Sequence, residues 1–300
     1  MRVARSPAEL EPAERAIAIG TFDGVHRGHR SVIDTAVAAG LRSTVVTFDP
    51  HPRSVLGYEV ELLATLERRL ELIEEAGVED VLVVDFTPEL SRLSPEEFVA
   101  SVLEPLGTQI VVAGEGFRFG NRRRGDLDLL RRLGLDVREV PLVEGVSSSR
   151  IRELLRAGDV PGAARLLGRA PELEGLVVAG DQRGGTLGFP TANLAVEADL
   201  AVPAYGIYAG AALVRDAASL RLRGSAYRAA LSIGVNPHYG GSERRIEPYL
   251  LGFDGDLYGQ RLVVELWQRL RDERAFASEH ELVAQIAQDV EQTRAAVRPI

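Results

Sequence analysis

The stretch Ala16–Arg30, AIAIGTFDGVHRGHR, decides the fold of the first half of this chain. It begins with an apolar run that ends at Gly20, and it closes with His26 and His29 at the expected start of a helix. Glycines let a backbone pass close to a ligand, and a helix N-terminus attracts phosphate through its free N–H groups and partial positive charge. The stretch therefore predicts a strand, a nucleotide-binding loop and a helix.

Two other interpretations of this stretch stay open at this point. It is also compatible with a plain strand–turn–helix that carries incidental histidines, and with a pair of histidine metal ligands. In a nucleotide site, the two imidazoles would hold the phosphates while the nucleotide is cut, because preorganised donors stabilise the charge that builds on the α-phosphate and the departing pyrophosphate. We assign nucleotide binding to four loop residues as well: Gly20, Phe22, Asp23 and Gly24.

The composition is that of a globular protein with two domains. The chain has 300 residues, of which 45% are hydrophobic and 26% are charged, so it can bury sizeable cores. Its net charge of −9 argues against broad nucleic-acid binding. It has no cysteine, no apolar run long enough to span a bilayer and no signal-peptide pattern at its start. We therefore expect a cytoplasmic protein.

All 35 basic residues are arginines. The absence of lysine excludes Schiff-base chemistry and the lysine of a P-loop. A phosphate site in this chain must therefore use arginine, backbone N–H groups, histidine or a metal ion.

The first half of the chain alternates apolar, β-rich runs with segments of helical periodicity. Continuous apolar runs such as VLVVDF and IVVAG suit strands that are buried on both faces, as in a parallel sheet. The alternation predicts a right-handed α/β sandwich. The expected strands are 16–20, 43–48, 80–86, 109–113 and 135–140, and the expected helices are 28–39, 65–76, 95–106 and 126–133.

The second half has a different texture. A pair of short helices is expected within 147–168, and a boundary rich in Pro, Gly and charge follows, which we place between residues 170 and 171. The short runs beyond it, separated by Gly-rich turns, predict an antiparallel β-barrel or sandwich. Within it, FDGDLYG (253–259) indicates a hairpin turn. A final helix is expected at 278–296, with Ser278 as its N-cap.

One further motif offers phosphate ligands to the first domain. In VSSSRIRELL, Ser148 or Ser149 would cap a helix, and Arg150 and Arg152 would reach triphosphate oxygens. An ordinary capped surface helix with solvated arginines is the alternative.

The second domain carries a Gly-rich motif, GGTLGFPTANL. The N–H groups of Gly184, Gly185 and Gly188 can cradle phosphate without a lysine. Thr191 and Asn193 offer the hard oxygens that Mg²⁺ binds. A Gly-rich turn with a proline bend, common in β proteins, is the alternative.

The chain resembles bacterial bifunctional riboflavin kinases/FAD synthetases over nearly its whole length. The resemblance rests on the order and spacing of GTFDGVHRGH, VVTFDPHPRSVL, LSPEEFV, GFRFGNRRRGD, SSSRIRELLRAGDVPGAARLLGR, GFPTANL and GFDGDLYG. It implies a Rossmann-like nucleotidyltransferase domain (1–170) and an antiparallel β-barrel kinase domain with a terminal helix (171–300). The kinase would convert riboflavin to FMN, and the first domain would join FMN to AMP from ATP, giving FAD and pyrophosphate.

The same resemblance implies the partners and the catalytic residues. Both reactions would use ATP with Mg²⁺. Apart from the resemblance, we expect a monomer or weak homo-oligomer with no nucleic-acid or membrane partner. His26, His29, Arg150 and Arg152 would stabilise charge in adenylyl transfer. Glu247 matches the catalytic carboxylate of the kinase, and it is also the only acid inside its strand pattern, although an isolated Glu is usually a solvent-facing residue.

Aromatic residues and four departures complete the comparison with the family. Phe117 and Phe119 alternate as in an extended segment and would pack against a flavin ring. The departures are Gly116 in place of Asp or Asn, Gly185 near a frequent Arg, Arg245 in place of Thr, and Gly252 in place of Asp. They leave two other hypotheses open: an enzyme that keeps only one of the two activities, and a flavin-binding or regulatory module without turnover.

Overall fold

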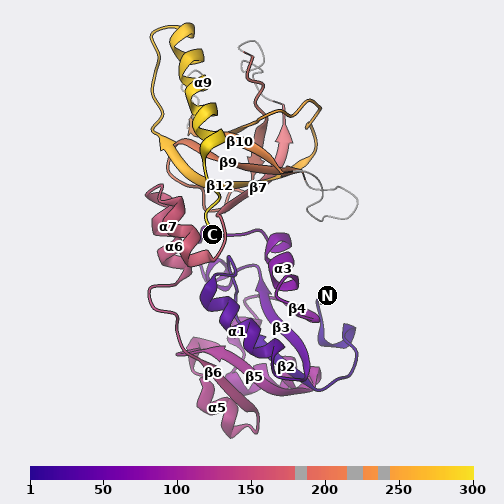
Figure 1. Ribbon diagram of the computed structural model, residues 1–300. Coiled ribbons are helices and arrows are strands. Elements are labelled where there is room, and N and C mark those ends of the chain that lie inside the picture. The colour runs from indigo at the N-terminus through magenta and orange to yellow at the C-terminus, as the bar shows by residue number, and fades with distance from the viewer. Residues whose placement is uncertain (180–187, 215–225, 236–243) are drawn as a thin grey trace. The chain divides into compact units, whose positions relative to one another are not determined.

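A computed structural model describes residues 1–179, 188–214, 226–235 and 244–300 (Figure 1). The chain forms two compact units. The first contains residues 1–62 and 66–148, and the second contains residues 63–65 and 149–300.

The first unit is built on a six-stranded sheet in the order β1-β4-β3-β2-β5-β6, in which every neighbouring pair is parallel. The strands are β1 Arg2–Ala4, β2 Arg15–Ile19, β3 Arg42–Asp49, β4 Asp80–Asp85, β5 Thr108–Gly114 and β6 Asp136–Val140. The α-helices are α1 Arg27–Val37, α2 Pro52–Val55, α3 Leu66–Glu74, α4 Pro95–Phe98 and α5 Leu127–Arg132. This arrangement confirms the predicted α/β sandwich.

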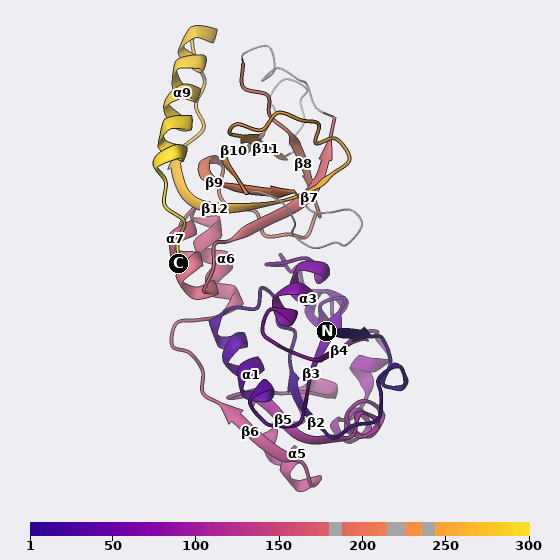
Figure 2. The ribbon, with the colours of Figure 1, turned by 45° about the vertical axis from the view of Figure 1, so that its right-hand side comes forward.

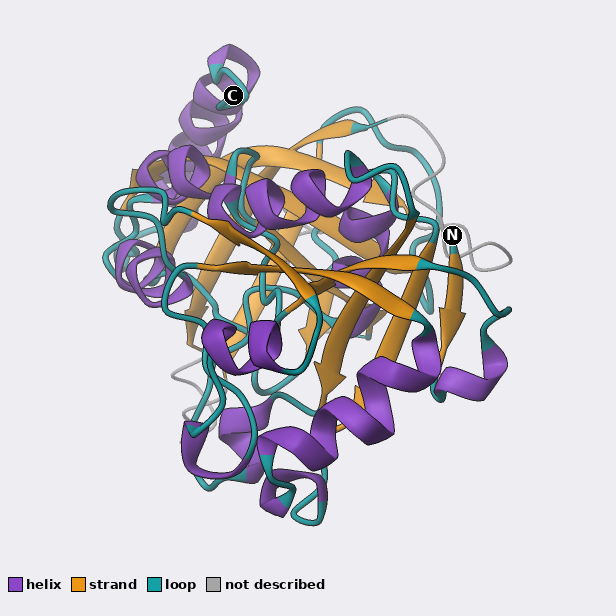
Figure 3. Ribbon diagram, turned by 90° about the horizontal axis from the view of Figure 1, so that it is seen from below, coloured by secondary structure: helices purple, strands orange, loops and turns teal. Residues whose placement is uncertain are grey.

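The hydrophobic core of the first unit lies on both faces of this sheet. Along β2, Ile17 and Ile19 join one buried cluster, whereas Ala16 and Ala18 join the other. A central parallel strand is covered by helices on both sides, which is why its sequence is apolar without alternation. Figure 3 shows the helices, in purple, packed outside the orange strands.

Two elements of the first unit differ from the expectation. Strand β1 was not expected, because a three-residue edge strand is too short to leave a pattern. The expected helix 95–106 is α4 followed by a π-helical turn, η3 Val99–Leu103, and a 3-10 turn, η4 Glu104–Leu106. Pro105 has no N–H for a helical hydrogen bond and its ring opposes the preceding turn, so a regular helix cannot run through it. The other short turns are η1 Pro7–Glu9, η2 Leu90–Arg92 and η5 Asn121–Arg123.

A buried ion cluster ties the amino ends of three strands together. Asp80 of β4 accepts hydrogen bonds from Arg15 of β2 and from Arg42 of β3, the latter at 2.6 Å. The side chains of Arg15 and Asp80 are fully buried. Arg15 also donates to the Thr44 hydroxyl at 2.9 Å. The cluster therefore holds the strands together at the edge opposite the carboxyl ends where β2 enters its loop.

The second unit is an antiparallel sheet whose described strands have the order β11-β10-β9-β12-β7-β8 (Figure 2). Its strands are β7 Glu172–Val178, β8 Asn193–Val196, β9 Gly206–Val214, β10 Tyr227–Val235, β11 Arg244–Leu250 and β12 Arg261–Arg271, and its helices are α6 Ser148–Arg156, α7 Val160–Leu167 and α9 Glu279–Ala295. The N–H of Ala192, just before β8, donates to the carbonyl of Pro248 in β11 at 3.0 Å. The two edges therefore approach each other, and the sheet curls into the predicted barrel around one hydrophobic core.

The predicted hairpin at 253–259 is wrong. Strands β11 and β12 flank this segment but are not neighbours, since β12 pairs with β9 and β7. A local turn is present, with the N–H of Tyr258 donating to the Asp256 carboxylate at 2.9 Å. The N–H of Gly259 then donates to the carbonyl of Val177 in β7 at 3.0 Å. Asp-Gly signals a turn but does not determine which strand the chain pairs with afterwards.

The terminal helix α9 is fastened at both ends. Ser278 caps it by accepting a hydrogen bond from the N–H of Glu281 at 3.2 Å, which confirms the predicted cap. Beyond the helix, Arg298 donates two hydrogen bonds to the buried carboxylate of Glu265 in β12, one at 2.8 Å from Nε. The indole N–H of Trp267 donates to the same carboxylate at 2.9 Å. No helix within the described ranges is long and apolar enough to cross a membrane.

Candidate functional sites

The first candidate site follows β2, at the carboxyl edge of the parallel sheet. The chain leaves β2 toward β3 and β4 on one side, and β5 and β6 lie on its other side, so the strand order reverses between β2 and β5. Open α/β sheets bind their ligands at such a reversal. The predicted nucleotide loop therefore lies where this fold places a ligand.

The loop from Gly20 to His26 is tightly wound. Phe22, Gly24 and Val25 have φ of 50°, 76° and 39°, in the left-handed region that residues with side chains rarely adopt. The Phe22 ring is buried, and its tip would lie 3.2 Å from a Cβ on Gly20. Strained backbone of this kind persists where the surrounding structure enforces it, and it concentrates at ligand sites.

The structure brings the two predicted histidines together. His26 precedes α1 as its N-cap, and its Nδ1 accepts a hydrogen bond from the N–H of His29 at 3.2 Å. The two rings stack with centroids 3.5 Å apart and planes 14° from parallel. Because Nδ1 of His26 is an acceptor, the proton of the neutral ring lies on Nε2.

Burial controls the charge of His29. It lowers the pKa of His29 well below its usual value of 6.5, and the neighbouring His26 and Arg69 lower it further. Nδ1 of His29 is buried and has no hydrogen-bond partner in the described part of the chain. His29 is therefore neutral at neutral pH, so it offers an N–H donor rather than positive charge.

Arg69 is a residue of this site that the sequence did not point to. It comes from α3, donates to the carbonyl of Thr21 at 2.9 Å and lies 3.8 Å from the Asp49 carboxylate. Burial lowers the pKa of this guanidinium, while Asp23 and Asp49 partly offset that effect. Arg69 thus places a buried cation beneath the loop, and no local motif could have shown that α3 faces it.

The serine motif makes one contact with the loop. The hydroxyl of Ser148 donates to the carbonyl of Asp23 at 3.2 Å, so two predicted site residues meet. Helix α6 begins at Ser148, so Ser148 and Ser149, the two residues predicted as its cap, lie inside its first turn. In a run of three serines, composition does not determine which one stands outside the helix.

The arginines of the same motif lie on α6 with Ser149. Arg150 is exposed and pairs with Glu153 on its own helix at 2.8 Å. Arg152 is buried. The phosphate-binding roles of Ser149, Arg150 and Arg152 stay predictions.

The two predicted aromatic residues after β5 form a stack. The rings of Phe117 and Phe119 have centroids 5.7 Å apart and planes 15° from parallel. Phe119 is buried in the core, where it also contacts Phe98, whereas Phe117 is half-buried. Phe117 is therefore the ring that a ligand can reach. Gly116 has φ of 73°, and a Cβ at this position would meet no atom within 4 Å, so there is also room for the Asp or Asn expected there.

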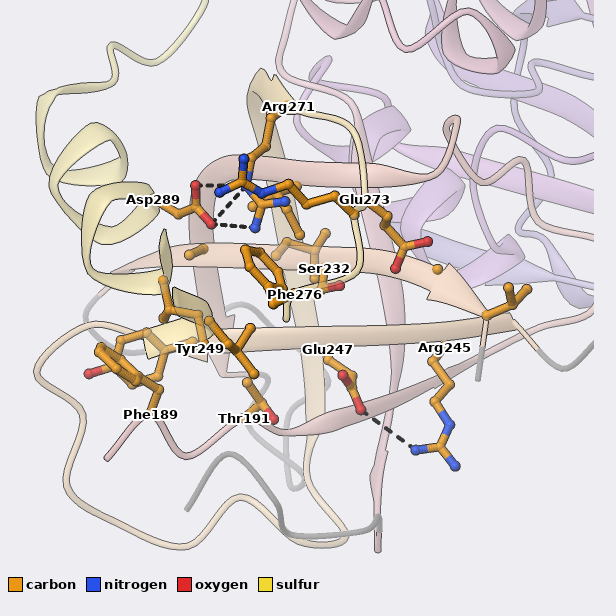
Figure 4. Close-up of a pocket in the computed structure, with 18 of the residues that line it drawn as sticks. Phe189, Thr191, Ser232, Arg245, Glu247, Tyr249, Arg271, Glu273, Phe276 and Asp289 are labelled. Atoms are coloured by element: carbon orange, nitrogen blue, oxygen red, sulfur yellow. Dashed lines mark hydrogen bonds and ion pairs between the residues drawn. The ribbon is translucent and has the colours of Figure 1, made fainter. Parts of the chain in front are cut away.

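The second candidate site is a cavity of about 390 Å³ on the outside of the barrel. Strands β9, β10 and β11 form its floor, and the segment after β12 together with α9 forms its wall (Figure 4). The predicted residues Thr191, Asn193 and Glu247 all line it. A cavity of this size is typical of small-molecule sites.

Glu247 reaches the cavity through the alternation of β11. Ile246 and Leu250 point into the barrel core, whereas Glu247 and Tyr249 point into the cavity. Arg245, two residues before Glu247, lies 3.9 Å from its carboxylate. Glu247 therefore lines the cavity, and its catalytic role stays a prediction.

Part of the Gly-rich motif lies outside the described residues, namely Gly184 and Gly185. Gly188 is described, is exposed and has φ of 83°, which favours glycine. Its role in phosphate binding stays a prediction.

Several cavity residues were missed because they come from elements distant in sequence. They are Ser232, opposite Glu247 in β10, with Tyr249, Arg271, Glu273, Phe276 and Asp289. Arg271 holds α9 in place by donating to Asp289 at 2.7 Å. Burial raises the pKa of Glu273, Glu247 raises it further, and Arg271 lowers it in part. No spacing rule links these positions, since the barrel assembles them.

Comparisons with known proteins match both units. Family models described as FAD synthetase and riboflavin kinase match residues 8–152 and 167–297. A Listeria monocytogenes protein described as bifunctional riboflavin kinase/FMN adenylyltransferase is 36% identical, over 96% of this chain and 94% of that one. A Bacillus subtilis protein of the same description is 37% identical, over 93% and 91%. A crystal structure described as a macrolide-efflux protein from Streptococcus pneumoniae has a TM-score of 0.86 and 31% identity, covering 97% of this chain and 98% of that one.

Proposed function

Because the chain belongs to the family of bifunctional riboflavin kinases/FMN adenylyltransferases, we propose which of its residues carry the two reactions. The protein phosphorylates riboflavin to FMN with ATP, and it transfers AMP from ATP to FMN, giving FAD and pyrophosphate. We assign the transferase to residues 1–170 and the kinase to residues 171–300.

The kinase reaction takes place in the cavity on the barrel. The observation that carries this assignment is that Glu247, Thr191 and Asn193 line the same cavity. Glu247 accepts the proton of the terminal ribityl hydroxyl as the oxygen attacks the γ-phosphate of ATP, and ADP leaves. Gly184, Gly185 and Gly188 hold the phosphates through their backbone N–H groups.

The donors around Thr191 and Asn193 fit Mg²⁺. Mg²⁺ takes hard oxygen ligands, keeps several waters and binds substrate phosphates rather than a full cage of protein groups. The Thr191 hydroxyl and the Asn193 amide oxygen would hold it, and among the described residues no cluster of three His or acidic side chains competes for it. When bound, the ion neutralises charge on the transferring phosphoryl group.

Adenylyl transfer takes place at the loop after β2. A phosphate oxygen of FMN attacks the α-phosphate of ATP, and pyrophosphate leaves. FMN already carries this oxyanion, so the step needs no general base, and a site made of N–H donors suits it. His26 and His29 stabilise the developing charge, and Arg150 and Arg152 act with them.

The remaining predicted residues bind the substrates of this first site. Gly20, Phe22, Asp23 and Gly24 form the nucleotide loop, and Ser148 and Ser149 extend it toward α6. Phe117, backed by Phe119, presents a ring to the flavin.

We also infer where and in what form the enzyme works. ATP is a substrate of both reactions, which supports a cytoplasmic location. The partners are small molecules, with no nucleic acid, and the enzyme acts as a monomer or weak homo-oligomer. Size-exclusion chromatography with light scattering tests the last point, and a stable high-order assembly would contradict it.

A chromatographic time course tests the two sites. Purified protein receives riboflavin, ATP and Mg²⁺, or FMN in place of riboflavin. We expect Glu247→Gln to stop FMN formation and leave FMN-to-FAD conversion intact, and His29→Ala to do the reverse. Glu291→Gln, an exposed carboxylate on α9, is the matched control. If the unmodified protein accumulates FMN and forms no FAD, the single-activity hypothesis is supported. If it forms no product from either riboflavin or FMN, the binding-module hypothesis is supported.

A further inference from the structure

The kinase cavity contains an acid that the reaction described above does not use. Glu273 follows β12 and faces the cavity, and Figure 4 shows it on the side away from Phe189 and Tyr249. Its carboxylate lies directly over Gly234 of β10, where a Cβ would come within 1.8 Å of Oε1. The position of this carboxylate therefore depends on glycine at 234.

Among the described residues, Glu273 has no hydrogen-bond or ion-pair partner, although arginines flank it in sequence. Arg271 is committed to Asp289 at 2.7 Å. Arg274 lies over the Phe276 ring at 4.8 Å. The cavity thus presents a carboxylate that only accepts hydrogen bonds and whose neighbours do not satisfy it.

The ligand group that suits this carboxylate is a hydroxyl. Riboflavin carries donors at two places, the hydroxyls of the ribityl chain and the ring N–H at the far end of the flavin. Glu247, which faces the reacting hydroxyl, pairs with Ser232 of β10, two residues from the Gly234 over which Glu273 lies. A donor that reaches Glu273 therefore lies beside the ribityl end. The aromatic side chains of Phe189 and Tyr249, 5.5 Å apart, gather on the other side, where a flavin ring would pack.

We propose that Glu273 binds the inner hydroxyls of the ribityl chain and so positions the terminal hydroxyl at Glu247. It is a positioning and specificity residue, since it selects flavins that carry a polyol chain. The proposal rests on the assignment of this cavity to the kinase.

The test distinguishes contacts to the ribityl chain of the substrate from contacts to its flavin ring. Riboflavin is the kinase substrate, and lumiflavin, which has the ring without the ribityl chain, is tested as a competitive inhibitor. Hydrogen bonds to a charged group predict that Glu273→Ala raises the KM for riboflavin about 10- to 100-fold. The inhibition constant of lumiflavin should change less than about twofold, because lumiflavin has no hydroxyl to lose.

Three further variants sharpen the result. Gly234→Ala displaces the carboxylate and should reproduce the KM effect. Glu273→Gln keeps an acceptor oxygen and should fall between Glu273→Ala and the unmodified protein. Asp272→Ala, which removes a neighbouring carboxylate with 81% of its side chain exposed, should leave KM unchanged. Fluorescence of Trp267, the single tryptophan of the chain, verifies that each variant is folded.

Two results would overturn the proposal. A riboflavin KM that does not move in Glu273→Ala excludes the contact. An equal rise in the riboflavin KM and the lumiflavin constant shows that Glu273 shapes the ring pocket instead. A failure of the site assignment looks different, because Glu247→Gln would then keep full kinase turnover.

Discussion

Replacing His26 by asparagine or by alanine separates its structural role from its chemical role. In the folded chain, Nδ1 of His26 caps α1 through the N–H of His29 at 3.2 Å, and the proposed chemical role of the ring is donation to a phosphate. Asparagine is among the best N-cap residues, so it retains the capping acceptor and removes the ring. Alanine removes both, which costs about 1 kcal/mol of stability for the lost cap.

The two variants should therefore differ in stability but not in chemistry. Each loses one preorganised donor, which lowers kcat for adenylyl transfer by roughly 10²- to 10³-fold. The assay is FAD formation from FMN and ATP, with riboflavin phosphorylation in the same sample as the internal control and urea unfolding for stability. Near-normal FAD formation by His26→Asn would refute the reasoning, since His26 would then be only a cap.

Three other predictions concern stability. Burial holds the pKa of His29 well below 6.5, so this imidazole binds a proton more readily in the unfolded chain than in the folded one. The contribution of buried, neutral His29 to the free energy of unfolding is therefore complete above about pH 6.5 and is lost as the pH falls. Urea midpoints by circular dichroism should be lower at about pH 5.5 than at about pH 7.5, and His29→Asn should reduce that difference. Asp80→Asn leaves buried Arg15 without its counter-charge and should lower the free energy of unfolding by about 3 kcal/mol or more. Replacing both residues, Asp80 by Leu and Arg15 by Met, should recover most of that loss, as measured by urea unfolding. Arg298→Ala should cost about 1 kcal/mol, because that side chain is 59% exposed, and an unchanged Trp267 unfolding midpoint would contradict it.

The parts of the fold that the sequence predicted are those that local chemistry determines. The apolar run before Gly20 forms β2 because both of its faces are covered, and His26 and His29 meet because three residues make nearly one helical turn. Ser278 caps α9 as expected, since the hydroxyl of a serine just before a helix accepts a hydrogen bond from a free N–H of the first turn.

The parts that it did not predict depend on tertiary assembly. Arg69 reaches the first site from a helix with no ligand motif, and Glu273 reaches the second from the segment after β12. Asp-Gly at 254–255 marked a turn but gave no information on the strand order of the barrel. Secondary-structure propensities and motifs depend on residues that are close in sequence, whereas these contacts join residues that are far apart in sequence.

The strand order of the barrel has a consequence for how the chain is made. Strand β7 lies between β8 and β12, and the residue that pairs with Glu172 is Glu265, about ninety residues later. At a ribosomal rate of roughly 5 to 20 residues per second, β7 waits about 5 to 20 s for that neighbour. Until then the backbone N–H and C=O groups on that edge of β7 are unpaired and can pair with other chains. The kinase barrel is therefore completed only near the end of translation, while the parallel sheet, whose strands end at Val140, can form early.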